Sequence, residues 1–238
     1  MQNTKSPRLA ALKAAVPCTL PVLTGYLVLG LAYGIYARSM GLGVWCAPLM
    51  ALVVYGGSLE FVAVSLLVSP FAPAAAFFMA LLIQARHLFY GLAMLERYRT
   101  PGLRRSYQIF ALTDETFSVV YSAQPPAGVD EGWFRFFISL LDHGYWVGSA
   151  ALGSVLGAAL PFDTTGIDFV MTALFTVIFL EQSRTQGQKV SALAGLGVSA
   201  VCLALFGADS FLLPAMAGIL IALLALRGRI EPKGGAEE

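Results

Sequence analysis

The sequence predicts an all-α, polytopic membrane protein with six to eight transmembrane helices, some of them broken or re-entrant. Of its 238 residues, 58% are hydrophobic and only 12% are charged, whereas about 25% of the residues in an ordinary soluble domain are charged. The hydrophobic residues recur in long runs, and most of the basic residues lie between those runs. Because so few charged side chains could not solvate a globule of this size, we expect the bilayer to be the solvent for most of the chain.

Eight apolar segments divide the chain, and we assign all of them to a single membrane domain, residues 1–238. A helix needs about 20 residues to cross the hydrocarbon layer. The first, second, third and fifth segments reach that length comfortably, whereas the fourth is short and has acidic residues in its middle. The segments lie near residues 16–37, 44–68, 71–95, 107–122, 134–160, 167–182, 190–206 and 211–226.

Basic residues predict which loops face the cytoplasm. Twelve of the fifteen Lys and Arg residues fall in four clusters, at 5–13, 97–105, 184–189 and 227–233, a pattern typical of cytoplasmic loops. If every segment crossed the membrane once from a cytoplasmic amino terminus, the second cluster would lie outside. Two arrangements stay open: either the second and fourth segments re-enter on one side and leave six full spans, or the amino terminus lies outside. Nucleic-acid binding is not expected, because the sequence offers no soluble domain to carry it.

Glycines spaced four residues apart predict close helix packing. Small residues on one helix face let two backbones approach each other in a membrane, where no hydrophobic effect drives helices together. Packing within the chain and packing against a partner subunit both fit this pattern. The pairs are Gly30 and Gly34, Gly144 and Gly148, and Gly153 and Gly157.

A faint internal repeat is consistent with a two-part architecture. Gly25-Tyr26 is followed by Leu59-Glu60, and Gly144-Tyr145 is followed at a similar distance by Leu180-Glu181. Transporters are often built from such repeats, with the binding site at the interface between them.

Ionisable residues inside apolar segments are the main functional candidates, since a charge at mid-bilayer costs about 2.5–3.5 kcal/mol even on the lenient insertion scale. Glu60 follows Gly56, Gly57 and Ser58, and the glycines can break the helix where it borders protein or a water-filled cavity. A carboxylate at such a break could bind a proton or a substrate ammonium. The alternative is a structural ion pair with Arg86.

The third segment carries a second group of polar residues. Gln84, His87 and Tyr90 recur on one helical face. Arg86 could hold a substrate carboxylate in a bidentate fork, or it could neutralise one of the embedded acids. His87 titrates near neutral pH and could relay protons.

Two further acidic pairs complete the candidates. In the fourth segment, Asp114 and Glu115 point in different directions on a helix, and near a break Thr113 or Asp114 could instead cap a half-helix. In the fifth segment, Asp142 and His143 could form a proton relay, although successive helical positions do not face each other.

The remaining patterns favour a transporter over other classes. The sequence has no nucleophile motif, metal-ligand spacing or phosphate-binding loop, so we expect neither an enzyme nor a bound cofactor or metal. A channel, which would need rings of charge or of carbonyl groups, is the alternative to a transporter. The embedded ionisable residues concentrate in the second to fifth segments, where we expect the transport pathway.

Three motifs in order resemble one known family. YGGSLEFV at residues 55–62, ARHLFYG at residues 85–91 and LTDETFS at residues 112–118 are similar to the AzlC family, the large subunit of bacterial branched-chain amino-acid exporters. The similarity extends over roughly residues 10–226. The chain departs from the family pattern at Gln84, where relatives often have asparagine, and at Glu60, where many have glutamine.

The resemblance implies a function and a partner. Members of the family export leucine, isoleucine, valine and close analogues across the bacterial cytoplasmic (inner) membrane, as multi-pass proteins working with a small AzlD-type membrane subunit. Exchange for protons is the usual proposal. Such a substrate would suit the embedded residues, because Arg86 could meet its carboxylate and Glu60 its ammonium group. Export of another small zwitterion, such as methionine, and a channel-like function remain the alternatives.

Overall fold

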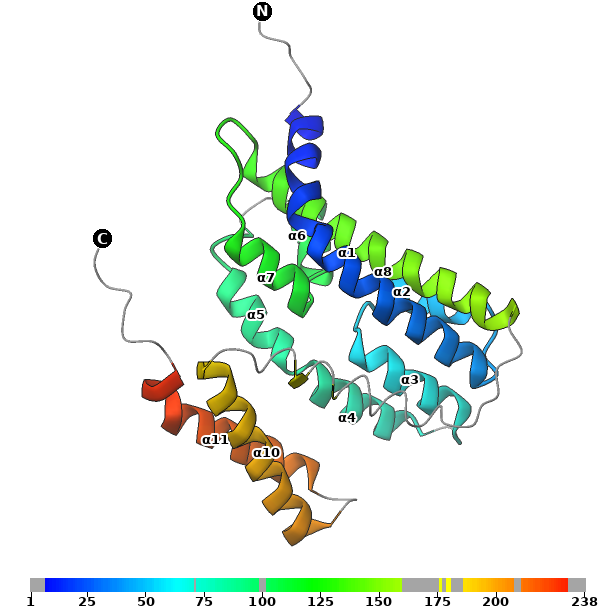
Figure 1. The fold of residues 1–238 in the computed structure, drawn as a ribbon, viewed down its shortest axis with the longest axis vertical. Helices are drawn as coiled ribbons and strands as arrows, with labels where there is room; N and C mark the ends of the chain where they lie inside the picture. Colours follow the sequence, from blue (N-terminus) through cyan, green and yellow to red (C-terminus); the bar gives the residue numbers. More distant parts are fainter. Residues whose placement is uncertain are drawn as a thin grey trace, which may run out of the picture. The chain divides into compact units, whose positions relative to one another are not determined.

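The computed structural model describes residues 7–70, 72–98, 102–159, 176, 179–180, 186–207 and 211–230, and within them every regular element is a helix (Figure 1). The chain falls into two compact units, Met1–Ile167 and Asp168–Glu238. The predicted segment 167–182 lies almost entirely outside the described residues, and so does Glu181. The assignment to one membrane domain stays a prediction.

Two long helices form the scaffold of the first unit. Helix α1 (Pro7–Ser39) and helix α8 (Glu131–Ala159) run side by side (Figure 1). A Cβ added at Gly34 would lie 2.3 Å from the carbonyl oxygen of Ala150, and one added at Gly153 would lie 2.3 Å from that of Leu31. Only glycine fits at these positions, which confirms close packing within the chain for two of the three glycine pairs.

The third glycine pair behaves differently. A Cβ added at Gly144 or Gly148 would meet no described atom within 4 Å. These two glycines therefore do not serve close packing among the described residues, and their packing against a partner subunit stays a prediction.

Among the described residues between α1 and α8, six short helices form three interrupted pairs. The break within residues 44–68 is confirmed: it runs from Val54 to Gly57, where Tyr55 (φ 45°) and Gly57 (φ 52°) adopt left-handed backbone conformations. The pairs are α2 (Cys46–Val53) with α3 (Ser58–Val68), α4 (Pro73–Gln84) with α5 (Arg86–Met94), and α6 (Leu103–Phe110) with α7 (Asp114–Ser122).

The third predicted segment needs a correction. We expected residues 71–95 to form one span, but the helix is interrupted at Ala85 between α4 and α5. Ala85 keeps helical dihedral angles (φ −54°, ψ −32°). Its carbonyl oxygen accepts a hydrogen bond from Leu88 N, only three residues later, at 3.2 Å, as in a tighter 3₁₀ turn. The interruption therefore needs no glycine or proline, which is why the sequence pattern did not reveal it.

The second unit contains a helical hairpin. Helices α10 (Gln186–Phe206) and α11 (Leu212–Ile230) pack against each other (Figure 1). Helix α10 ends at Phe206 and is followed by Gly207, whose φ of 72° suits glycine. A Cβ at Gly218 would lie 2.8 Å from a methyl group of Val198, so a small residue again permits a close approach.

Large apolar side chains face outward in both units. Val28 is 66% exposed, Leu103 89% and Leu205 73%. Such surfaces suit a lipid environment and would be unusual on a soluble monomer. Among the described helices, α1 and Lys189–Phe206 of α10 are each long and apolar enough to cross a bilayer. The count of six to eight spans stays a prediction.

Candidate functional site

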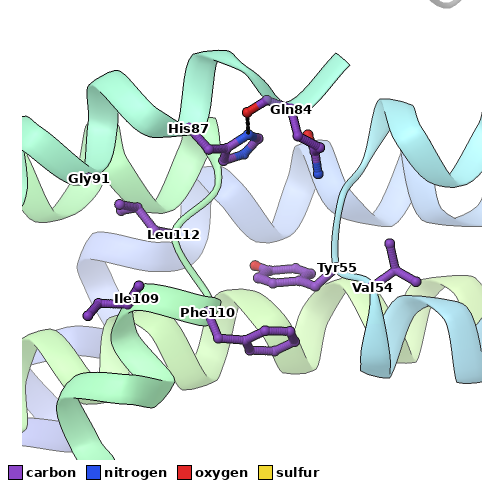
Figure 2. A pocket seen from close by; sticks show the side chains of 8 residues that line it. All are labelled: Val54, Tyr55, Gln84, His87, Gly91, Ile109, Phe110 and Leu112. Atoms are coloured by element: carbon purple, nitrogen blue, oxygen red, sulfur yellow. Dashed lines mark hydrogen bonds between the residues drawn. The ribbon is translucent and has the colours of Figure 1, made fainter. Parts of the chain in front are cut away.

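The three interruptions meet around one cavity. Its volume is about 200 Å³, below the roughly 300–1,000 Å³ of pockets for drug-sized ligands, so it suits a smaller molecule. Figure 2 shows its walls converging from the ends of α2, α4 and α6 and the start of α5. It is lined by Val54, Tyr55, Gln84, His87, Gly91, Ile109, Phe110 and Leu112.

The lining combines apolar walls with two polar atoms in need of a partner. Val54, Ile109 and Leu112 supply aliphatic surface. The Tyr55 hydroxyl and the Gln84 side-chain oxygen are buried without a hydrogen-bond partner among the described residues. A buried polar group without a partner costs about 1–3 kcal/mol, so these two atoms are unsatisfied polar groups within residues that line the cavity.

Glycine at position 56 leaves the space that the Gln84 side chain occupies beside the cavity. A Cβ there would lie 2.6 Å from Gln84 Nε2, so any larger residue would displace this side chain. The neighbouring Gly57 precedes α3 with a positive φ and places Ser58 as the first helical residue. The three residues therefore shape the break and do not themselves line the cavity.

Glu60 holds the same break through a hydrogen bond to its backbone. It is fully buried, and its Oε1 accepts a hydrogen bond from Gly56 N at 2.9 Å. Trp146 Nε1 donates to both carboxyl oxygens, at 3.0 and 3.2 Å. The alternative of an ion pair with Arg86 is wrong, since Glu60 has these partners and Arg86 has another acid. A role for Glu60 in binding ammonium or protons stays a prediction.

Arg86 joins the first residues of three half-helices. It forms an ion pair with Asp114 (Nη1–Oδ2, 2.9 Å) and donates to Ser58 Oγ at 3.2 Å. Ser58 begins α3, Arg86 begins α5 and Asp114 begins α7. Helix amino termini carry partial positive charge, so this junction favours anions. The alternative that Arg86 neutralises an embedded acid is confirmed, with Asp114 as that acid, although Arg86 keeps 42% of its side chain exposed.

His87 and Tyr90 connect the cavity to α7. His87 Nδ1 lies 3.3 Å from the carbonyl oxygen of Gln84, drawn as the dashed line in Figure 2. The His87 ring meets Tyr90 edge-on, at 5.7 Å between centroids, and Tyr90 stacks on Phe117 at 4.6 Å. His87 and Tyr90, which were predicted to share one face of the helix, therefore contact each other, with His87 on the cavity wall and Tyr90 on Phe117 of α7.

Glu115 and Asp142 lie at the two ends of a buried polar layer. Tyr26 donates a hydrogen bond to Glu115 at 2.9 Å, and Thr116 donates one to Asp142 at 3.0 Å. Thr113 connects the two hydroxyls, since its Oγ1 lies 2.9 Å from that of Tyr26 and 3.2 Å from that of Thr116. Thr113 also caps α7 by accepting a bond from Thr116 N, which confirms the capping prediction for this residue.

Asp142 and His143 do not form a direct relay. His143 turns away from the layer: its Nδ1 lies 2.8 Å from the Tyr107 hydroxyl, and its Nε2 lies 3.3 Å from the carbonyl oxygen of Ala51. Its ring packs on Tyr55 at 4.4 Å between centroids, so it supports the wall of the cavity from outside.

The sequence patterns missed several residues at this site. Tyr26 and Thr116 belong to the polar layer, Trp146 donates to Glu60, and Tyr55 and Phe110 line the cavity. One available signal was helical spacing, because Trp146 lies four residues after Asp142 on the same face of α8. Apolar residues near a helix break carry no such signal.

Comparison with known proteins identifies the family. The family model described as AzlC protein matches residues 21–160, more than half of the chain. The chain belongs to the AzlC family. The matched region ends within the first unit and contains all three interruptions and the cavity.

Relatives extend the similarity over nearly the whole chain. The branched-chain amino acid transport protein AzlC of Bacillus subtilis is 47% identical over 96% of this chain and 90% of its own length. A membrane protein of Haemophilus influenzae is 44% identical over 98% of this chain and 96% of its own. The inner membrane protein YgaZ of Escherichia coli is more distant, at 24% identity over 75% of each chain. No solved structure matches the chain.

Proposed function

We propose that this protein is a secondary transporter that exports leucine, isoleucine, valine and close analogues across the bacterial cytoplasmic membrane. It would act as the large subunit of a two-component permease, with a small AzlD-type membrane subunit, and exchange its substrate for protons. The name of the Bacillus subtilis relative supports the substrate class. The name of the Escherichia coli relative supports the inner membrane as its location.

One observation carries the proposal: three interrupted helix pairs end at a single small cavity. Non-helical backbone inside a membrane is tolerated only against protein or a water-filled cavity. In secondary transporters such breaks form the binding site, because the ends of half-helices offer partial charges and free backbone groups. The aliphatic walls at Val54, Ile109 and Leu112 suit a branched hydrocarbon side chain.

The polar end of the substrate would meet the junction around Arg86. The substrate carboxylate would compete with Asp114 for the guanidinium group, which is 42% exposed and attached to the start of a half-helix. A carboxylate accepts two parallel bonds from an arginine. Displaced Asp114, or the unpartnered oxygen of Gln84, would then accept from the substrate ammonium group.

The direct test is counterflow in proteoliposomes containing the full chain, with and without the small subunit. We expect unlabelled leucine inside the vesicles to drive saturable uptake of labelled leucine, with competition by isoleucine and valine. Leu112→Trp, which fills the cavity, should abolish the exchange, whereas Leu193→Trp, at a position 68% exposed on α10, should leave it intact. A linear, non-saturable flux would favour a channel, and no flux under either condition would contradict transport of these substrates.

A further inference from the structure

A continuous chain of hydrogen bonds links Glu115 to Asp142. From Glu115 Oε2 it runs through the Tyr26 hydroxyl (2.9 Å) and Thr113 Oγ1 (2.9 Å). It then passes through Thr116 Oγ1 (3.2 Å) to Asp142 Oδ2 (3.0 Å). Helices α1, α7 and α8 and the residue before α7 each contribute to it. Two carboxyl groups are therefore joined by three hydroxyl groups and four contacts of hydrogen-bonding length.

The number of protons available determines how many of these four hydrogen bonds can form at once. Each hydroxyl carries one proton, so the three hydroxyls can fill only three of the four contacts. With both carboxyl groups ionised, Tyr26 and Thr116 each donate to one of them, and Thr113 can donate to a single neighbour. One contact would then bring two oxygen lone pairs together with no proton between them. One additional proton, on either carboxyl group, completes all four bonds.

The carboxyl group that holds the additional proton determines the direction in which all four hydrogen bonds donate. When Glu115 is protonated, each group donates toward Asp142. When Asp142 is protonated, each group donates toward Glu115. The backbone bond from Thr116 N to Thr113 Oγ1 fits both arrangements, because a hydroxyl oxygen has two lone pairs. The chain therefore has two complete arrangements that differ by the transfer of one proton.

Asp142 has the environment of a carboxyl group that holds a proton. It is fully buried, and its Oδ1 has no hydrogen-bond partner among the described residues. No cation pairs with it in the described part of the chain, and Arg86, which faces Glu115 at the other end, pairs with Asp114. A buried carboxylate with neither a cation nor a full set of hydrogen bonds is strongly disfavoured relative to the neutral acid.

The charged and titratable groups around the two ends connect the chain to the cavity. Tyr55 is one of the residues that line the cavity, and its buried hydroxyl faces Asp142 and the hydroxyls of Tyr26, Thr113 and Thr116. The other groups that face the ends are Tyr98 near Asp142, and Asp114, Arg86 and Tyr90 near Glu115. A substrate that bonds to Tyr55 or displaces Asp114 from Arg86 would therefore change the environment of both ends.

We propose that Glu115 and Asp142 share one proton, which passes between them through the hydroxyls of Tyr26, Thr113 and Thr116. In one direction Glu115 gives its proton to Tyr26, and each hydroxyl gives its own to the next oxygen until Asp142 Oδ2 receives one. One O–H bond breaks and one forms at each hydroxyl, and a single proton moves overall. The inference rests on the proposed function only in coupling this step to export.

Thr116→Val tests the relay, because it removes one hydroxyl and keeps the side-chain volume and both acids. In proteoliposomes with a pH-sensitive dye inside, we expect the variant to lower leucine-driven proton flux by about tenfold or more. The proton flux is divided by leucine counterflow in the same variant, which involves no net proton movement, so that a loss of folding or of leucine binding is separated from a loss of the relay. Thr116→Ser restores the hydroxyl and should restore the proton flux. Unchanged proton flux in Thr116→Val would overturn the proposal.

Infrared difference spectroscopy tests the shared proton without any transport. We expect the wild-type protein to show the C=O band of a protonated carboxyl group at neutral pH, and Asp142→Asn to change it. Glu131→Gln, at a position 53% exposed, serves as the control and should leave the band intact. A band insensitive to both Asp142→Asn and Glu115→Gln would refute the shared proton. A band that responds in a protein without leucine transport would support the shared proton and contradict the transport function.

Discussion

The long helices α1 and α8 use glycine in the opposite way from the α2–α3 break. At Gly34 and Gly153 the missing side chain lets two continuous helices touch through their backbones. At Gly57, where an added Cβ would meet no described atom within 4 Å, glycine instead supplies a positive φ that ends one helix and starts another. The comparison separates a packed scaffold from interrupted helices that surround the cavity. In a membrane, no hydrophobic effect drives helices together, so close packing of α1 on α8 can supply the stability that holds such breaks in place.

The largest effect should come from the junction of the interrupted helices. Arg86→Ala removes the partner of Asp114 and the proposed ligand of the substrate carboxylate. We expect leucine counterflow to fall by about 100-fold while the protein still inserts and keeps its elution profile in detergent. Arg86→Lys keeps the charge but loses the planar fork, so it should recover only part of the flux. Wild-type flux in Arg86→Ala would remove Arg86 from the site.

A smaller effect is expected in the scaffold. Gly153→Ala forces a Cβ against the backbone of Leu31 and should destabilise the protein by about 1–3 kcal/mol, the usual cost of overpacking. Gly148→Ala, five residues earlier on α8, meets open space among the described residues and is the matched control. Thermal unfolding in detergent measures both. Equal melting temperatures for the two variants would contradict the proposed packing of α1 on α8.

The smallest effect should come from the cap of one half-helix. Thr113→Ala removes the side chain that accepts from Thr116 N and should cost about 1 kcal/mol of stability. Thr113→Ser keeps the hydroxyl and should unfold at nearly the wild-type temperature. If both variants lose the same stability, the methyl group rather than the cap stabilises the start of α7.

The sequence predicted the helical class and interruptions in the second and fourth segments, for physical reasons that can be read locally. Two consecutive glycines before Ser58 indicate a break, and Thr113 before an acidic turn indicates a cap. The interruption at Ala85 has no such marker, because its backbone stays helical. Pairing is also a long-range property: the preference of Arg86 for Asp114 over Glu60 depends on how three half-helices meet.

Cavity walls were the hardest part to predict. Ile109, Phe110 and Leu112 look like any other apolar residues in a membrane segment, and only the end of α6 between them brings them to the cavity. The hydroxyl of Tyr26 reaches Glu115 across 89 residues of sequence. No local pattern encodes that distance, whereas the three family motifs do mark the segments that take part.

Protection of a thiol by substrate tests most directly whether the cavity binds the substrate. The measurement uses Ile109→Cys, on the cavity wall, in a chain whose three native cysteines (Cys18, Cys46 and Cys202) are replaced by alanine. Leu103→Cys lies on the same helix, α6, at a position 89% exposed, and serves as the control. We predict that leucine slows modification by a small thiol reagent at residue 109 and leaves the rate at residue 103 unchanged. Equal rates with and without leucine at residue 109, in protein that still exchanges leucine, would place the substrate elsewhere.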